Sequence, residues 1–65
     1  MEAIFKIKLS KNGKESIEIF SSYNILADAK VNLLSELDAY AIDKGDKIEL
    51  IRIATNYVEY EIIIS

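Results

Sequence analysis

The residues of this chain that could do chemistry are carboxylates, serines, lysines and tyrosines, because the sequence contains neither histidine nor cysteine. Asp43 and Asp46 form an acidic pair that flanks Gly45 in the segment DKGD. Carboxylate oxygens at this spacing could hold a hard cation, but the segment lacks the ligand order and the closing glutamate of a calcium loop. We therefore interpret it as a polar connection between a helix and a strand.

Catalysis is not predicted from the remaining candidates. An active site needs a nucleophile or a titratable pair held in a pocket, and the sequence shows no pattern that would build one. Phosphate-binding loops need closely spaced glycines, whereas the two glycines of this chain, Gly13 and Gly45, are both explained as turn residues. We expect a non-enzymatic protein that needs neither a cofactor nor a metal.

Basic side chains gather near the start of the chain, at Lys6, Lys8, Lys11 and Lys14. With Phe20 and Tyr57 as stacking platforms, these lysines could form a strip for single-stranded nucleic acid. The chain as a whole has a net charge of −3, however, which disfavours attraction to phosphate. We expect a solvated, partly ion-paired surface and no nucleic-acid partner.

The length and composition indicate one small domain, residues 1–65. A chain of this size buries only about 60% of its unfolded surface, so it depends on a well-packed core or on association with another chain. No apolar run approaches the roughly 20 residues of a membrane helix. Because Glu2 also stands where a signal peptide is basic, we expect a cytoplasmic protein with no membrane partner.

Hydrophobic periodicity predicts two hairpins with a helix between them. Residues 3–9 and 16–21 alternate apolar with polar side chains, as do residues 47–54 and 57–64, which is the pattern of half-buried strands. From about residue 24 to 44 the period changes to three and four, which predicts an amphipathic helix. Its apolar stripe is Leu26, Ala29, Leu33, Leu37, Tyr40 and Ala41, with Leu34 at the edge. We expect Ser22 or Asn24 to cap the helix and Gly45 to end it.

The register of the first hairpin is chosen by its apolar faces and charges. A three-residue turn over residues 11–13 pairs Ile7 with Ile17 and Lys6 with Glu18, whereas a two-residue turn would put the apolar faces out of phase. We prefer the three-residue turn, with Gly13 as a left-handed bulge residue.

The second hairpin has two possible registers. A two-residue turn at Thr55 and Asn56 pairs Arg52 with Glu59, and we prefer it for that charge pair. A longer loop would exchange the set of side chains that the third strand turns inward.

The order ββαββ predicts an α+β protein in which one helix packs on one face of a four-stranded mixed sheet. The first and last strands are the most apolar, so we place them at the centre, parallel to each other, with strand order 2-1-4-3 and a right-handed crossover. This is a β-grasp-like arrangement.

The hairpin NGKESIEIF, the helix opening SSYNILADAK and the ββαββ order resemble the small immunoglobulin-binding β-grasp domains of bacterial surface proteins, the protein L type more than the protein G type. The resemblance spans the full chain and is most specific in the NG pair followed, seven residues later, by Phe20. It implies contact with an antibody light chain through the second strand and the helix.

The sheet face away from the helix is the predicted interaction site. The side chains expected to meet the helix are Phe5, Ile7, Ile17, Ile19, Val58, Tyr60, Ile62 and Ile64. Those expected to point the other way are Ile4, Phe20, Ile48, Leu50, Tyr57 and Ile63. Ile4 and Phe20 should oppose each other directly, with Tyr57 nearby. A contiguous apolar patch of this kind usually marks an interface.

We therefore predict a protein-interaction domain that forms a homodimer through this face, with Ile4, Phe20 and Tyr57 as apolar anchors and Lys6, Glu18 and Glu59 as polar surroundings. Ile63 belongs to the same predicted site, at the other end of the face. Strand addition at residues 16–21 or 47–54 is another route to self-association, and a foreign protein could take the same surface. A plainer explanation is that large side chains are tolerated on a wet strand face. Two alternatives stay open: a small phage- or plasmid-type regulator that binds a larger protein through the acidic side chains Asp28, Asp38 and Asp43, and a designed or selected scaffold without biological function.

Overall fold

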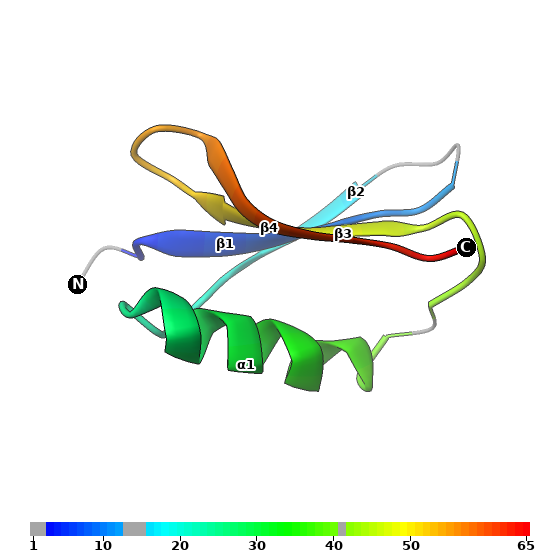
Figure 1. The fold of residues 1–65 in the computed structure, drawn as a ribbon, viewed down its shortest axis with the longest axis horizontal. Coiled ribbons are helices and arrows are strands. Elements are labelled where there is room, and N and C mark those ends of the chain that lie inside the picture. The colour runs from blue at the N-terminus through cyan, green and yellow to red at the C-terminus, as the bar shows by residue number, and fades with distance from the viewer. Residues whose placement is uncertain (1–2, 13–15, 41) are drawn as a thin grey trace.

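The computed structural model describes residues 3–12, 16–40 and 42–65, which form one helix on one face of a four-stranded sheet (Figure 1). The elements are β1 (Phe5–Ser10), β2 (Ser16–Phe20), α1 (Leu26–Leu37), β3 (Lys47–Arg52) and β4 (Tyr57–Ile63). The α+β class and the ββαββ order predicted from the periodicity are confirmed.

The predicted strand order is wrong. The sheet runs β2-β1-β3-β4 and every neighbouring pair is antiparallel, so β3 and not β4 lies beside β1. The burial of the two strands gives the reason. In β3 the four residues from Ile48 to Ile51 are all buried, whereas β4 is largely exposed and carries Glu59 and Glu61. The strand of the second hairpin with the continuous buried run therefore takes the central place, and the residues 47–54 expected at an edge lie largely in the middle of the sheet.

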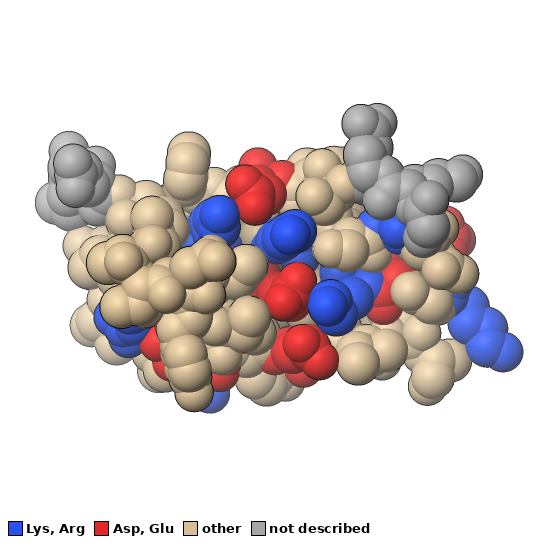
Figure 2. Space-filling view, turned by 90° about the horizontal axis from the view of Figure 1, so that it is seen from above, with Lys and Arg blue, Asp and Glu red and all other residues tan. Residues whose placement is uncertain are grey.

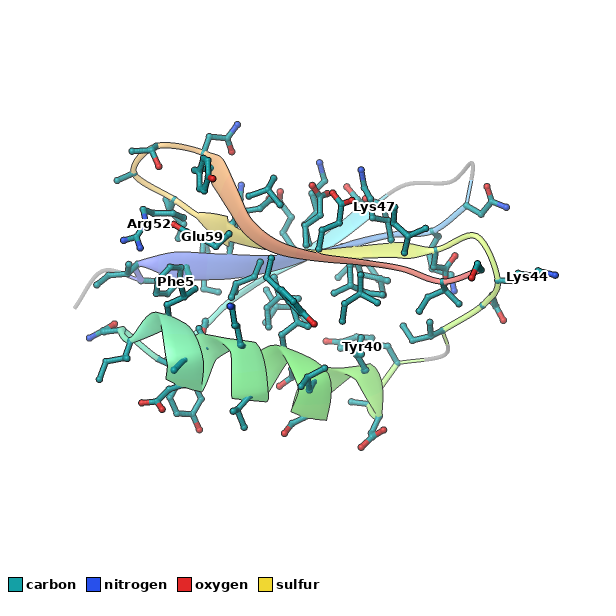
Figure 3. All side chains as sticks on the ribbon, in the orientation of Figure 1. Phe5, Tyr40, Lys44, Lys47, Arg52 and Glu59 are labelled. Carbon is teal, nitrogen blue, oxygen red and sulfur yellow. The ribbon has the colours of Figure 1, made fainter. Side chains whose placement is uncertain are left out.

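The hydrophobic core fills the space between α1 and the sheet. It consists of Phe5, Ile7, Leu9, Ala29, Leu33, Ile48 and Leu50. The partly buried side chains that pack against it include Leu26, Leu37, Tyr40, Ile42, Ile62 and Ile64. Figure 3 shows the Tyr40 ring between the end of α1 and the sheet. The predicted helix stripe therefore supplies the core, except for Ala41, which lies outside the described residues.

The β1–β2 register lies two residues away from the predicted one. Ile7 is opposite Ile19 and Lys8 is opposite Glu18, with residues 11–15 connecting the strands. Because side chains alternate with period two, a shift of two keeps the apolar residues on the helix side, and the pattern could not distinguish the registers. The predicted turn glycine, Gly13, lies outside the described residues, as does Lys14.

The β3–β4 hairpin contains a bulge that the sequence pattern did not predict. Leu50 is opposite Tyr60, but Ile51 is opposite Val58, so Glu59 has no counterpart in the β3 register. The connection is the longer one, over residues 53–56, with Asn56 in the left-handed region at φ 55°. Asparagine tolerates that conformation better than most residues.

Because the connection is the longer one, a different set of β3 side chains points toward the helix. Ile48 and Leu50 are core residues, so their predicted position on the outer sheet face is wrong. Ile51 lies opposite Lys6 on the outer side, yet it is also buried. Figure 1 shows the β3–β4 hairpin rising above the sheet on that side, as expected where a bulge increases the local twist.

Helix α1 is shorter than predicted. Its N-cap is Ile25, without a side-chain hydrogen bond, and its C-cap is Asp38, so the expected caps at Ser22 or Asn24 and at Gly45 are wrong. Gly45 does have a positive φ of 94°, but it lies in the turn before β3. Beyond the helix end, Tyr40 and Ile42 still pack against the core.

Candidate functional site

The outer sheet face is charged at its centre and apolar only at its margins. The cross-strand row through the middle is Glu18, Lys8, Glu49 and Glu61. Figure 2 shows acidic and basic side chains alternating over this part of the surface, with uncharged surface beside them. The face is therefore not the contiguous apolar patch that the sequence predicted, since Ile48 and Leu50 belong to the core.

The apolar anchors predicted for that face do not come together. Phe20 lies opposite Lys6 and not opposite Ile4. Tyr57 lies in β4 opposite Arg52, so two central strands separate it from Phe20. Ile63 lies opposite Lys47, toward the other end of β4. Phe20 is the most exposed large apolar side chain among the described residues, at 72%.

Both predicted charge pairs form, although in other registers. Lys6 Nζ lies 3.2 Å from Glu18 Oε2, diagonally across the first hairpin. Arg52 donates through Nε to Glu59 Oε2 at 2.6 Å, and its guanidinium carbon lies 4.9 Å from the centre of the Phe5 ring. Figure 3 shows these three side chains at the same end of the molecule. Long charged side chains can reach diagonal partners, so a charge pair does not define a register.

Among the described residues, no strand pairs with the outer edge of β2. Ser21 N donates to Phe5 O at 3.0 Å, and in an antiparallel ladder such bonded pairs recur at every second residue. Ile17 and Ile19 therefore turn their main-chain groups toward β1, and Ser16, Glu18 and Phe20 turn theirs away. Since β2 ends the sheet and these three residues are exposed, the groups face solvent.

Apolar side chains accompany this edge on both faces of the sheet. Ile17 points to the helix side but is 44% exposed, because α1 approaches the sheet most closely at β3. Ile19 borders a small apolar gap under the helix that is also lined by Leu37 and Tyr40. Phe20 extends from the outer face. We call the free main-chain groups and apolar side chains of Ser16–Phe20 the β2 edge.

The edge formed by β4 differs from the β2 edge. Its ladder is interrupted by the bulge at Glu59, and Glu61 adds a second acidic side chain. Bulges and charges are the devices by which proteins prevent unwanted strand pairing. On the helix side, Lys30 Nζ lies 5.2 Å from the centre of the Tyr60 ring, which partly covers this strand. The β2 edge carries one acidic residue, Glu18, and its register is regular.

The segment DKGD, interpreted from the sequence as a polar connection, forms a hydrogen-bonded joint around Asp46 between α1 and β3. The Asp46 carboxylate, whose side chain is 1% exposed, accepts from Lys11 Nζ at 2.6 Å and from the main-chain N–H groups of Asn12 and Asp43 at 3.0 and 2.9 Å. The Lys11 hydrogen bond, followed by the two main-chain bonds, lowers the pKa of Asp46 to about 2. Within residues 3–12, 16–40 and 42–65 there is no group of three acidic side chains that could hold a metal ion.

The solvent side of α1 carries a second exposed apolar area. Val31 is 64% exposed and Leu34 is half exposed, three residues apart on the helix. Tyr23 and Val31 line a shallow depression together with Asp28. In the helical period Val31 lies nearly opposite the apolar stripe, so the sequence predicts its exposed position and the structure confirms it.

Comparison with protein-family models, curated proteins and solved structures finds no match for this chain. Its function must therefore be inferred from the surfaces described above. Within the described residues, α1 is too short and too polar to cross a membrane.

Proposed function

We propose that this chain is a non-enzymatic protein-interaction domain that binds an extended segment of a partner along the β2 edge. The observation that carries the proposal is the coincidence, on one five-residue strand, of outward main-chain groups and uncovered apolar side chains. Strand addition uses both features, since main-chain hydrogen bonds provide affinity and alternate side chains provide specificity.

Three side chains define what the added strand would meet. On the helix side its residues would contact Ile17, which the helix leaves exposed, and Ile19. On the outer side they would contact Phe20. The edge thus offers apolar contacts on both faces, and the expected partner segment is an extended, β-branched or aromatic sequence.

The proposal is tested with a capped six-residue peptide of alternating valine and threonine, with a lysine at each end for solubility. In an NMR titration, the amide signals of Glu18 and Phe20 should move most and become protected from exchange. The amides of Glu61 and Ile63, at the other edge of the sheet, are the internal control. Largest changes on β4 or α1, or no changes at all, would contradict the proposal.

Phe20→Lys provides the matching variant. Because the side chain is 72% exposed, the substitution should leave the domain folded and weaken peptide binding. Unfolding of this variant would show instead that Phe20 belongs to the core.

A second candidate function is that of a small regulator that binds a larger protein through the solvent side of α1. It is favoured by the exposed Val31 and Leu34 beside the acidic residues Asp28 and Asp38. A partner at this site should lose affinity when Asp28→Lys and Val31→Lys are introduced and should be insensitive to Phe20→Lys. The opposite pattern assigns the partner to the β2 edge.

A further inference from the structure

The β2 edge is complementary to a second copy of itself. Its outward main-chain groups belong to Ser16, Glu18 and Phe20, which are evenly spaced about Glu18. When two β2 strands are placed antiparallel with a two-fold axis at Glu18, each outward residue meets an outward residue. Ser16 then pairs with the partner's Phe20, and Phe20 with the partner's Ser16. A two-fold interface of this kind uses the same surface on both chains.

We propose that the chain forms a two-fold dimer in which the β2 strands pair antiparallel, with Glu18 opposite the partner's Glu18, to make one continuous sheet. This proposal rests on the proposed function, because it names the occupant of the same edge. It replaces self-association through the outer sheet face, whose centre is charged.

The apolar side chains select this register. With Glu18 on the axis, Ile17 lies opposite the partner's Ile19 at two symmetric positions on the helix side, so the exposed Ile17 is covered by an apolar neighbour. Moving the axis to Ile19 would place Ile17 opposite the partner's Ser21. Moving it to Ile17 would carry Ile19 beyond the end of the partner's strand. The register centred on Glu18 is the one that pairs all five residues of β2.

The charges are compatible with this register, but they weaken the dimer. Two glutamates directly opposite each other repel. Each one already has a lysine of its own chain beside it, since Lys6 Nζ lies 3.2 Å from Glu18 Oε2, and Lys8 is opposite Glu18 in the β1–β2 register. Removing the Glu18 charge should therefore strengthen the dimer. The same change should weaken the binding of a partner that places a basic residue opposite Glu18.

The proposed strand pairing also determines where the two copies of α1 lie in the dimer. Antiparallel strands that share one sheet face are related by an axis perpendicular to the sheet, so both copies of α1 would lie on the same side of the dimer. The paired segment has only five residues on each chain. Interfaces below about 1,200 Å² are usually weak, and a dissociation constant in the micromolar to millimolar range is expected.

Cysteine cross-linking tests the pairing directly, because the natural chain contains no cysteine. In Glu18→Cys the two Cα atoms at the axis would be about 5.5 Å apart, which is within the range of about 4.4–6.8 Å that a disulfide spans. Mild oxidation should therefore produce a covalent dimer, and denaturation in urea before oxidation should prevent it. The matched control is Glu61→Cys, which replaces the same residue type at an outward position of the β4 edge. Ile19→Cys reports on the alternative register in which the two-fold axis lies at Ile19.

The expected result is rapid cross-linking of Glu18→Cys and slow, collisional cross-linking of the other two variants. Light scattering over a concentration series should show that Glu18→Gln tightens the dimer roughly twofold to fivefold and that Ile17→Lys abolishes it. Equal rates for Glu18→Cys and Glu61→Cys, or faster cross-linking of Ile19→Cys, would overturn the pairing. So would a wild-type chain that stays monomeric at millimolar concentration.

The peptide titration separates failure of the dimer from failure of the proposed function. A monomeric chain that binds the valine–threonine peptide at Glu18 and Phe20 refutes the dimer and leaves the proposed function intact. A monomeric chain that does not bind the peptide refutes both.

Discussion

Arg52 donates through Nε to Oε2 of Glu59 at 2.6 Å, and this contact joins β3 to the one residue of β4 that has no counterpart in the strand register. The guanidinium also lies 4.9 Å from the centre of the buried Phe5 ring. The pair therefore connects the bulge to the core, and the bulge in turn places Glu59 where Arg52 can reach it.

Glu59→Gln should lower the free energy of unfolding by about 1 kcal/mol, because a charge-assisted hydrogen bond in a partly buried setting is replaced by a neutral one. Lys6→Gln, which breaks the more exposed pair with Glu18, should cost no more than about 0.5 kcal/mol. Urea unfolding of the two variants at low protein concentration measures both values. Equal losses would mean that the pair at the bulge contributes no more than a surface ion pair.

Acid should weaken the joint formed by Asp46. Its pKa is lowered from 3.8 to about 2 in the folded chain, chiefly by the hydrogen bond from Lys11. The unfolded chain therefore binds a proton at higher pH than the folded chain does. The stabilisation from Asp46 is complete above the unfolded pKa and is lost as the pH falls from about 4 to about 2. Urea midpoints at pH 6, 4, 3 and 2 follow this loss.

The matched variant for this pH dependence is Asp46→Asn. An amide cannot accept from Lys11 and two main-chain N–H groups through both of its ends, so the variant should be less stable near neutral pH and should lose less stability between pH 4 and 2. Asp38→Asn, at an exposed position after α1, controls for the loss of one negative charge. A profile for Asp46→Asn that is parallel to wild type would contradict the assignment.

Alkaline pH should act on the same joint through Lys11. The hydrogen bonds that Lys11 donates, first to Asp46 and then to Asp43, raise its pKa above 10.5 in the folded chain. Its contribution is complete below the unfolded pKa and is lost as the pH rises through the higher folded value. The alkaline loss should be smaller in Asp46→Asn, which the same urea series extended to high pH would measure.

Gly45→Ala should destabilise the turn before β3 by about 1–3 kcal/mol. The residue has φ 94°, and a β-carbon there would come within 2.6 Å of Asn12 Nδ2. Combining it with Asn12→Gly, which keeps the N–H that binds Asp46, should recover the part of the loss caused by the contact and leave the backbone strain. Full recovery in the double variant would show that φ at this position imposes no cost.

The orientation of β3 predicts very different effects for two apolar residues of the second hairpin. Leu50 is fully buried, and Leu50→Ala should cost about 2–5 kcal/mol and leave a domain of this size close to unfolding. Ile63 is 64% exposed, and Ile63→Ala should change stability by no more than about 0.5 kcal/mol. Thermal unfolding followed by circular dichroism distinguishes them. Similar small losses for both would instead support the two-residue turn at Thr55 and Asn56.

The sequence by itself determined which segments form strands and helix and which face of β1 and α1 is apolar. Period-two alternation around Ile7 and period-3.6 recurrence around Leu33 are local properties, so they could be read without any knowledge of distant partners. It also predicted the charge pairs of Lys6 with Glu18 and of Arg52 with Glu59, because opposite charges flank matching apolar positions. Phe20 was predicted as an interaction residue because the same period-two alternation places it on the outer face of its strand.

Tertiary structure alone decided the strand order, both registers and the length of the helix. A shift of two residues between Ile7 and Ile17 leaves every side chain on its own face, so the pattern carries no information about it. The choice of β3 as a central strand depends on the total apolar area that the sheet and α1 bury together. In the observed pairing of β3 with β1, Leu50 lies opposite Ile7 and faces the helix. The β2 edge is also a consequence of the tertiary structure, because the single helix packs over β3 and leaves Ile17 exposed.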